Sequence, residues 1–121
     1  MGWKVKRNPL DILMSTYIRA KAEGVCEWCG QRPCRDAHHF KGRIRMTVRF
    51  DEENMVALCG YCHRYLHNNP DVNTDFFRKR LGNERYENLV MRANMTTKEY
   101  PIDKEKIKDD LNRKIKLLNE V

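Results

Sequence analysis

The first regular pattern along the chain is a stripe of apolar residues at helical spacing that begins just after Asn8 and Pro9. Asn8 is a typical helix N-cap, Pro9 suits the first helical position, and Gly24 is a typical stop. The pattern therefore predicts a helix over about 9–23. The apolar members of the stripe are Leu10, Leu13, Met14, Tyr17 and Ile18.

The middle of the chain has no long apolar stripe. Residues 25–35 are rich in cysteine and predict an irregular segment. In residues 36–50, two short runs, AHHF and MTVRF, flank the sequence KGR, which predicts a short twisted hairpin. Residues 60–68 predict a helix that ends at the sequence NNPD.

The last part of the chain predicts three more helices. The segment NTDFFRKRLG indicates a helix capped by Asn73 or Thr74 and ended by Gly82, and NERYENLVMRAN indicates a second helix. The third starts near Asp103 and is amphipathic. Its apolar stripe is Ile107, Leu111, Ile115 and Leu118, and the second helix turns Tyr86, Leu89 and Val90 inward.

Together these patterns predict an α+β fold in a single domain, which is usual for a chain of 121 residues. We expect an N-terminal helix in 1–24, a metal-stabilised centre in 25–70 and a helical C-terminal extension in 71–121. The centre has few large apolar residues, so a metal cross-link would replace part of a core there.

The composition is basic. Lys and Arg number 24 against 17 Asp and Glu, which gives a net charge of +7. This balance favours a polyanionic partner, of which nucleic acid is the commonest, although an acidic membrane surface also satisfies it. The sequence has no apolar signal region and no apolar run of about 18 residues, so we expect an intracellular, cytoplasmic protein.

Four of the five cysteines form two CxxC pairs, CEWC and CGYC. Four thiolates in two such pairs are the usual tetrahedral ligands of structural zinc. A redox-active pair is the alternative, but two pairs without a βαβ context argue against it. The predicted zinc ligands are Cys26, Cys29, Cys59 and Cys62, and Cys34 is interpreted as a small, partly buried side chain.

All four histidines of the chain lie in the centre. His63 and His67 are four residues apart and would share one face of a helix. Adjacent side chains on a strand point to opposite faces, so one of His38 and His39 can face an ion while the other stays free to accept a proton. Asn54 is the candidate for holding the free imidazole in place.

The order of these residues resembles that of the HNH endonucleases, a family with the ββα-metal (His-Me finger) fold. The segments that carry the resemblance are CEWCG, AHHF, DEENMVALCGYCH and RYLH, within about 25–68. The spacing of the histidines and the asparagine is also similar to that of the nuclease colicins. The resemblance implies a DNA endonuclease that hydrolyses phosphodiester bonds with one metal ion.

The resemblance also implies a role for each residue. His39 would be the general base that activates water, and Asn54 would fix the loop and orient His39. His38, His63 and His67 would hold the catalytic divalent ion. Many members of the family have Asp where this chain has His38, so we expect a softer site in which Mn²⁺, Ni²⁺ or Zn²⁺ competes with Mg²⁺.

A second resemblance extends over nearly the whole chain. The segments PLDILMSTYIRAK, RFDEENMVALCGYC and FFRKRLGNERYENL are similar to the NinG/Rap recombination proteins of lambdoid phages. This resemblance implies cleavage of branched DNA, such as Holliday junctions, inside the host cell of a phage or prophage. Cutting two symmetric strands of a junction would favour a homodimer.

Basic residues surround the histidines in sequence. If the chain continued as a strand after His39, the basic residues at odd positions from 41 to 49 would share one face and could contact phosphates. The predicted DNA contacts are Arg35, Lys41, Arg43, Arg45, Arg49 and Arg64.

Two other interpretations fit the same motifs. One is an HNH nuclease of the packaging or homing type that acts on duplex DNA. The other is a zinc-finger DNA-binding module without catalysis, which needs the cysteines and the basic surface but neither His39 nor Asn54.

Overall fold

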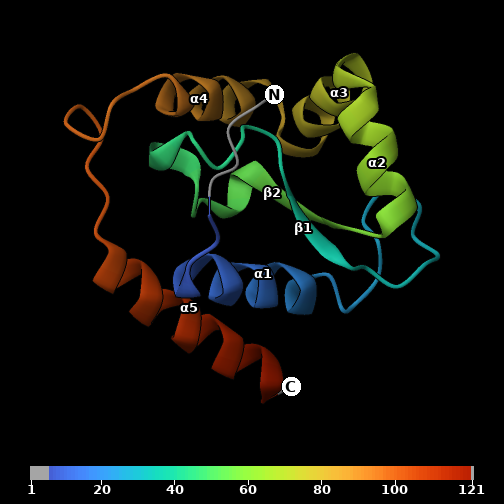
Figure 1. The fold of residues 1–121 in the computed structure, drawn as a ribbon, viewed down its shortest axis with the longest axis horizontal. Helices are drawn as coiled ribbons and strands as arrows, with labels where there is room; N and C mark the ends of the chain where they lie inside the picture. The colour runs from blue at the N-terminus through green and yellow to red at the C-terminus, as the bar shows by residue number, and fades with distance from the viewer. Residues whose placement is uncertain (1–5, 121) are drawn as a thin grey trace.

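The computed structural model describes residues 6–120 (Figure 1). It confirms the expected α+β class: a two-stranded antiparallel sheet is surrounded by helices. In chain order the elements are α1 (Pro9–Lys21), β1 (Asp36–His39), η1 (Met46–Val48), η2 (Glu52–Asn54), β2 (Met55–Leu58), α2 (Gly60–Asn68), α3 (Pro70–Leu81), α4 (Asn83–Ala93) and α5 (Lys104–Asn119), where η1 and η2 are short 3₁₀ helices.

The strand pairing differs from the predicted hairpin. Strand β1 pairs with β2, in the register His38–Val56 and His39–Met55, and not with residues 46–50. The hairpin prediction was wrong because residues 46–48 form the 3₁₀ turn η1. There, Val48 is buried against α4, and a ladder to β1 would remove it from that contact.

Strand β2 is buried on both faces. Val56 and Leu58 pack with α2 and α3, whereas Met55 and Ala57 pack with α1 and α5. This alternation follows from the period of two in a strand and explains the unbroken apolar run MVAL. The sheet is therefore the middle layer, with α1 and α5 on one side and α2 and α3 on the other (Figure 1).

The helix termini follow local chemistry. Asn8 and Asp11 form a reciprocal capping box at the start of α1, and Asp103 caps α5. Helix α3 begins at Pro70, which occupies its first turn, so the predicted cap at Asn73 or Thr74 was wrong. The predicted end at Gly82 is confirmed, and its φ of 82° is a conformation that favours glycine.

A buried ion pair joins the long β1–β2 loop to α1. Arg49 is 5% exposed, and its Nε donates to Asp11 Oδ1 at 2.9 Å. A second nitrogen of Arg49 donates to the carbonyl oxygen of Lys6 at 3.0 Å. The loop is thereby fixed to the first turn of the helix. None of the helices within residues 6–120 is long and apolar enough to cross a membrane.

Candidate functional site

The four predicted zinc ligands come together in the structure. The sulfur atoms of Cys26, Cys29, Cys59 and Cys62 all lie within 4.8 Å of one another, close enough to hold a structural metal such as zinc. Backbone N–H groups of Arg32 and Gln31 donate to the Cys29 sulfur, and they lower the pKa of this thiol to about 6. The fifth cysteine, Cys34, packs instead against the core beside α1, as the sequence predicted.

The four histidines line one open cleft of about 1020 Å³ that runs along β1 between α1 and α2. The strand register explains how adjacent histidines reach it from different sides. His38 pairs with Val56 on the α2–α3 face of the sheet, and His39 pairs with Met55 on the α1 face. The expected division of the two side chains between opposite faces is therefore confirmed.

His38 is held from the C-terminal extension. It is 5% exposed, and its Nε2 donates to the side-chain oxygen of Asn73 on α3 at 3.0 Å. Its ring lies 5.0 Å from that of His63 and 6.1 Å from that of Phe77, measured between centroids. Burial lowers the pKa of His38 to about 4, so the imidazole is neutral at pH 7 and its Nδ1 keeps a free lone pair.

His63 is held by the first residue of β1. Its Nδ1 donates to Asp36 Oδ2 at 2.9 Å, so Nε2 is the ring nitrogen left to bind an ion. The same carboxylate oxygen accepts two bonds from Arg35, at 3.0 and 2.8 Å. Burial acts to raise the pKa of Asp36, but the hydrogen bonds from Arg35 and His63 outweigh it and hold the pKa below its ordinary value.

The guanidinium of Arg35 lies directly against Gly60, the first residue of α2. A Cβ atom on Gly60 would lie 2.8 Å from Arg35 Nη1. The glycine inside the second CxxC pair therefore makes room for the group that fixes Asp36. The metal-binding motif and the histidine of α2 are thus connected through Gly60, Arg35, Asp36 and His63.

His39 is bound by the backbone of the long loop. Its Nε2 donates to the carbonyl oxygen of Arg49 at 3.1 Å, and Nδ1 retains the lone pair. Burial lowers the pKa of His39 to about 4, although the bond to Arg49 opposes this shift. The group that orients His39 directly is therefore a carbonyl oxygen, which sequence reasoning did not identify.

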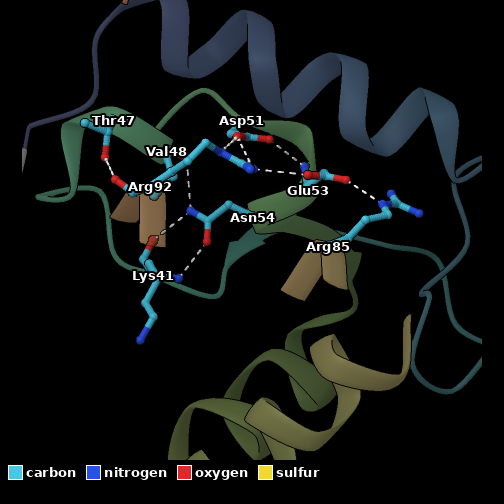
Figure 2. Close-up of polar contacts among 8 residues, drawn as sticks. All are labelled: Lys41, Thr47, Val48, Asp51, Glu53, Asn54, Arg85 and Arg92. Carbon is cyan, nitrogen blue, oxygen red and sulfur yellow. Dashed lines mark hydrogen bonds and ion pairs between the residues drawn. The ribbon is translucent and has the colours of Figure 1, made fainter. Parts of the chain in front are cut away.

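Asn54 acts on the loop and not on the imidazole. It is fully buried, its Oδ1 accepts from the Lys41 N–H at 2.8 Å, and its Nδ2 donates to the carbonyls of Lys41 and Val48 at 2.9 and 3.1 Å (Figure 2). Val48 precedes Arg49, whose carbonyl binds His39. Asn54 thus fixes the loop that carries the group holding His39.

Helix α4 clamps the same loop from outside. Arg92 Nη2 donates to Asp51 at 2.8 Å and to Glu53 at 3.1 Å, and Arg85 donates to Glu53 at 2.6 Å (Figure 2). Thr47 Oγ1 donates to the Arg92 carbonyl at 2.6 Å. Two helices of the C-terminal extension therefore support the cleft: α3 holds His38, and α4 holds the β1–β2 loop.

Comparisons of the chain with protein-family models, with curated proteins and with solved structures gave no match.

The ring nitrogens of the histidines are less convergent than the cysteine sulfurs. Among residues 6–120, only the cysteines form a set of three or more ligand atoms within 4.8 Å of one another. His38, His63 and His67 do not, although they line the same cleft. The donor chemistry nonetheless suits a divalent ion, because His38 and His63 are each hydrogen-bonded through one ring nitrogen, and the other nitrogen is left to bind the ion.

The predicted DNA-contacting residues lie in different parts of the structure. Arg35 and Arg43 line the cleft, and Arg64 is exposed on α2. Arg45 donates to the Ala93 carbonyl at 3.2 Å. The prediction for Arg49 was wrong, because its guanidinium is buried against Asp11. Residues 41–49 are not a strand, so their expected common face does not exist.

Two basic residues that line the cleft were missed from the sequence: Arg7 and Arg19. Arg19 lies on a polar stripe of α1 with Asp11 and Ser15, and all three line the cleft. The signal was present as an i, i+4, i+8 repeat beside the apolar stripe. It is easily taken for a solvated helix face.

Proposed function

We propose that this chain is a metal-dependent DNA endonuclease of the HNH type, with a ββα-metal core formed by β1, β2 and α2. The observation that carries the proposal is the state of the histidines. His38, His39 and His63 each donate one ring N–H to a fixed oxygen acceptor, so in each ring the other nitrogen is the one left to accept a proton or bind an ion. Three imidazoles oriented in this way in one arginine-lined cleft suit hydrolysis of a phosphodiester.

His39 is the general base in this proposal. Its Nδ1 takes a proton from water while its Nε2–H stays bonded to the Arg49 carbonyl. The acceptor stabilises the imidazolium that forms and keeps the ring from rotating. The hydroxide then attacks phosphorus in line with the leaving 3′-oxygen. The bond from phosphorus to that oxygen breaks and the oxygen takes a proton from solvent, which gives 5′-phosphate and 3′-hydroxyl ends.

His38, His63 and His67 are the proposed ligands of the divalent ion, either Mg²⁺ or a softer ion such as Mn²⁺, Ni²⁺ or Zn²⁺. When bound, the ion supplies positive charge to the scissile phosphate. Asp36 and Asn73 orient two of these imidazoles. Hydrogen bonds of this kind fix the ring and raise the basicity of the free nitrogen.

The arginines of the cleft provide affinity for the phosphate backbone. Arg7, Arg19 and Arg43 line it together with Arg35, which also holds Asp36. Contacts to phosphates are independent of sequence and weaken as salt rises. The finer proposal is a structure-specific enzyme acting on branched recombination DNA, as the NinG/Rap resemblance implies, with a homodimer cutting both strands.

The test is conversion of supercoiled plasmid to nicked circles with Mg²⁺, Mn²⁺, Ni²⁺ or Zn²⁺. We expect nicking by the wild type and a loss of at least about 100-fold in the rate for His39→Ala, the size of a general-base contribution. His38→Ala should in addition weaken ion binding, whereas His39→Ala should not. No nicking with any ion would leave a DNA-binding zinc module as the better description, and equal nicking by His39→Ala would show that the HNH mechanism proposed here is wrong.

A comparison of substrates tests the finer proposal. Four-way junctions and linear duplexes of the same sequence are cleaved under the same conditions, and we expect faster cleavage of the junction. Equal rates on both would instead favour a duplex nuclease of the packaging or homing type.

A further inference from the structure

Each CxxC pair contains an aromatic residue that the core does not bury. Trp28 lies in CEWC and Tyr61 in CGYC, and they are 39% and 60% exposed. Tyr65 follows one turn after Tyr61 on α2 and is 40% exposed. Large aromatic side chains exposed side by side are uncommon on the surface of a soluble domain and indicate an interaction site.

Tyr61 and Tyr65 share one face of α2 because they are four residues apart. The ring centroids of Trp28 and Tyr65 are 6.2 Å apart, with 35° between their planes. At the other end, the guanidinium of Arg32 lies 4.9 Å from the centroid of Tyr61. We call Trp28, Arg32, Tyr61 and Tyr65 the knuckle face.

The knuckle face is rigidly supported. The edge of Phe76 on α3 meets Trp28 at a centroid distance of 5.0 Å and an angle of 89°. Arg32 Nη1 lies 3.8 Å from the Cys59 sulfur, so the four-cysteine cluster sets the position of the guanidinium. The surface is therefore formed before any partner binds, which reduces the entropy lost on binding.

The charge of this surface is positive. Arg32 is exposed, and Arg64 is exposed on α2 between the two tyrosines. The neighbouring acidic residue, Glu27, is engaged elsewhere: its carboxylate accepts from Arg80 at 2.7 Å and from the Ala57 N–H at 2.9 Å. Aromatic rings combined with exposed guanidinium groups are the chemistry that binds single-stranded nucleic acid.

The knuckle face and the cleft lie on opposite sides of one helix. On α2, His63 follows Tyr61 by two residues, and His67 follows Tyr65 by two residues. Because each residue turns an α-helix by about 100°, the two tyrosines lie about 200° around the axis from the two histidines. A nucleic acid that crosses α2 can reach both surfaces. One strand would then meet the histidine cleft while an unpaired strand meets the aromatic rings.

We propose that the knuckle face stacks the unpaired bases of single-stranded DNA, such as a strand displaced at a branch. The choice of DNA rests on the proposed function, whereas the stacking chemistry rests on the surface itself. A duplex hides the faces of its bases, but every unpaired base has one to offer, so the contact is tolerant of sequence. Arg32 and Arg64 hold the backbone beside the rings.

Trp28 provides the probe for the test. The variant Trp3→Phe leaves Trp28 as the only tryptophan. Its fluorescence is titrated, without added divalent ion, with an oligo-dT of about 10 nucleotides, a typical site size. The matched ligand is an abasic strand of equal length, which has the same phosphates and no bases. We expect quenching and about tenfold tighter binding for oligo-dT.

Variants then localise the contact. Tyr61→Leu and Tyr65→Leu, with zinc content and circular dichroism checked, should bring the affinity for oligo-dT close to that for the abasic strand. Arg43→Gln, which alters the cleft, should weaken both strands equally. Equal binding of the two strands by the Trp3→Phe protein would overturn the proposal, as would quenching by an acidic peptide but not by oligo-dT.

The outcome is separable from that of the proposed function. If oligo-dT is preferred to the abasic strand but plasmid is never nicked, base stacking on the knuckle face is supported and the endonuclease proposal is wrong. If plasmid is nicked through His39 but oligo-dT and the abasic strand bind equally, the endonuclease proposal is supported and the stacking proposal is wrong.

Discussion

The Nε2 atom of His38 donates to the side-chain oxygen of Asn73, 35 residues later in the chain, at 3.0 Å. This bond fixes the tautomer of His38, because an amide oxygen can only accept. It also shows that the orientation of His38 depends on α3, a helix outside the segment that carries the HNH resemblance.

Replacing Asn73 should therefore alter His38 without unfolding the chain. Asn73→Ala removes the acceptor, and we expect the affinity for Mn²⁺ or Co²⁺, measured by calorimetry, to fall about 10- to 100-fold. Asn73→Asp keeps an oxygen in place and should restore most of the affinity. In nitrogen-15 NMR spectra, the Nε2–H tautomer of His38 should dominate in the wild type and lose its dominance in Asn73→Ala.

The matched control is Thr74→Ala, on the next residue of the same helix. It should leave both the ion affinity and the tautomer unchanged. If Asn73→Ala retains the tautomer and the affinity of the wild type, then Asn73 does not position His38.

The ion pair between Asp11 and Arg49 should be a main source of stability for the long loop. Arg49→Met leaves the Asp11 carboxylate buried without its charged partner, and we expect the free energy of unfolding to fall by about 3–5 kcal/mol. Urea denaturation measures this change. Arg64→Met, at an exposed position of α2, is the control and should change stability by less than about 0.5 kcal/mol.

A comparison with the wild type separates a structural role from a DNA contact. Suppose that Arg49→Met unfolds at the same urea concentration as the wild type but binds DNA more weakly than the wild type. Arg49 would then belong to the DNA-binding surface, contrary to its burial.

The cysteine cluster predicts that zinc and folding are coupled. We expect purified protein to contain stoichiometric zinc, and chelation to abolish the cooperative thermal transition, because structural zinc contributes about 10 kcal/mol or more to folding. Cys26→Ser should lose the metal and the transition. Cys34→Ser should keep both, since Cys34 lies outside the cluster. Loss of zinc in Cys34→Ser would show that the ligand set is different.

Much of this architecture could be predicted from local sequence. The starts of α1 and α5 follow from Asn8 and Asp103, because a cap is decided by neighbouring residues. Helix α1 ends at Lys21, about two residues before the end predicted from Gly24. The cysteine cluster followed from spacing alone. The opposite facing of His38 and His39 followed from the period of a strand once β1 was placed.

The errors and omissions concern contacts between distant segments. The strand partner of β1 was misplaced because MTVRF and MVAL are similar apolar runs, and only packing of Val48 on α4 decides between them. Arg49 resembles any other basic residue in sequence, and only its approach to Asp11 shows it to be buried. Nothing in the sequence near Asn73 indicates that it binds His38, because an asparagine at that position resembles a helix cap.

The pKa of His39 predicts how stability depends on pH. Burial lowers it to about 4 in the folded chain, against about 6.5 when unfolded. Between these values the unfolded chain binds more protons, so the free energy of unfolding should fall as pH drops through this window and be constant above it. At one pKa unit per about 1.4 kcal/mol, His39 should account for a loss of the order of 1–2 kcal/mol between pH 7 and 5.

Urea denaturation at these two pH values, on zinc-loaded protein, measures the effect. His39→Gln has no titrating imidazole and should show a shallower dependence on pH than the wild type by that amount. Asn68→Gln, at an exposed position of α2, is the control and should retain the wild-type dependence. If His39→Gln has the same slope as the wild type, then His39 is protonated alike in the folded and unfolded chains. It would then be too accessible to water to be the buried base proposed here.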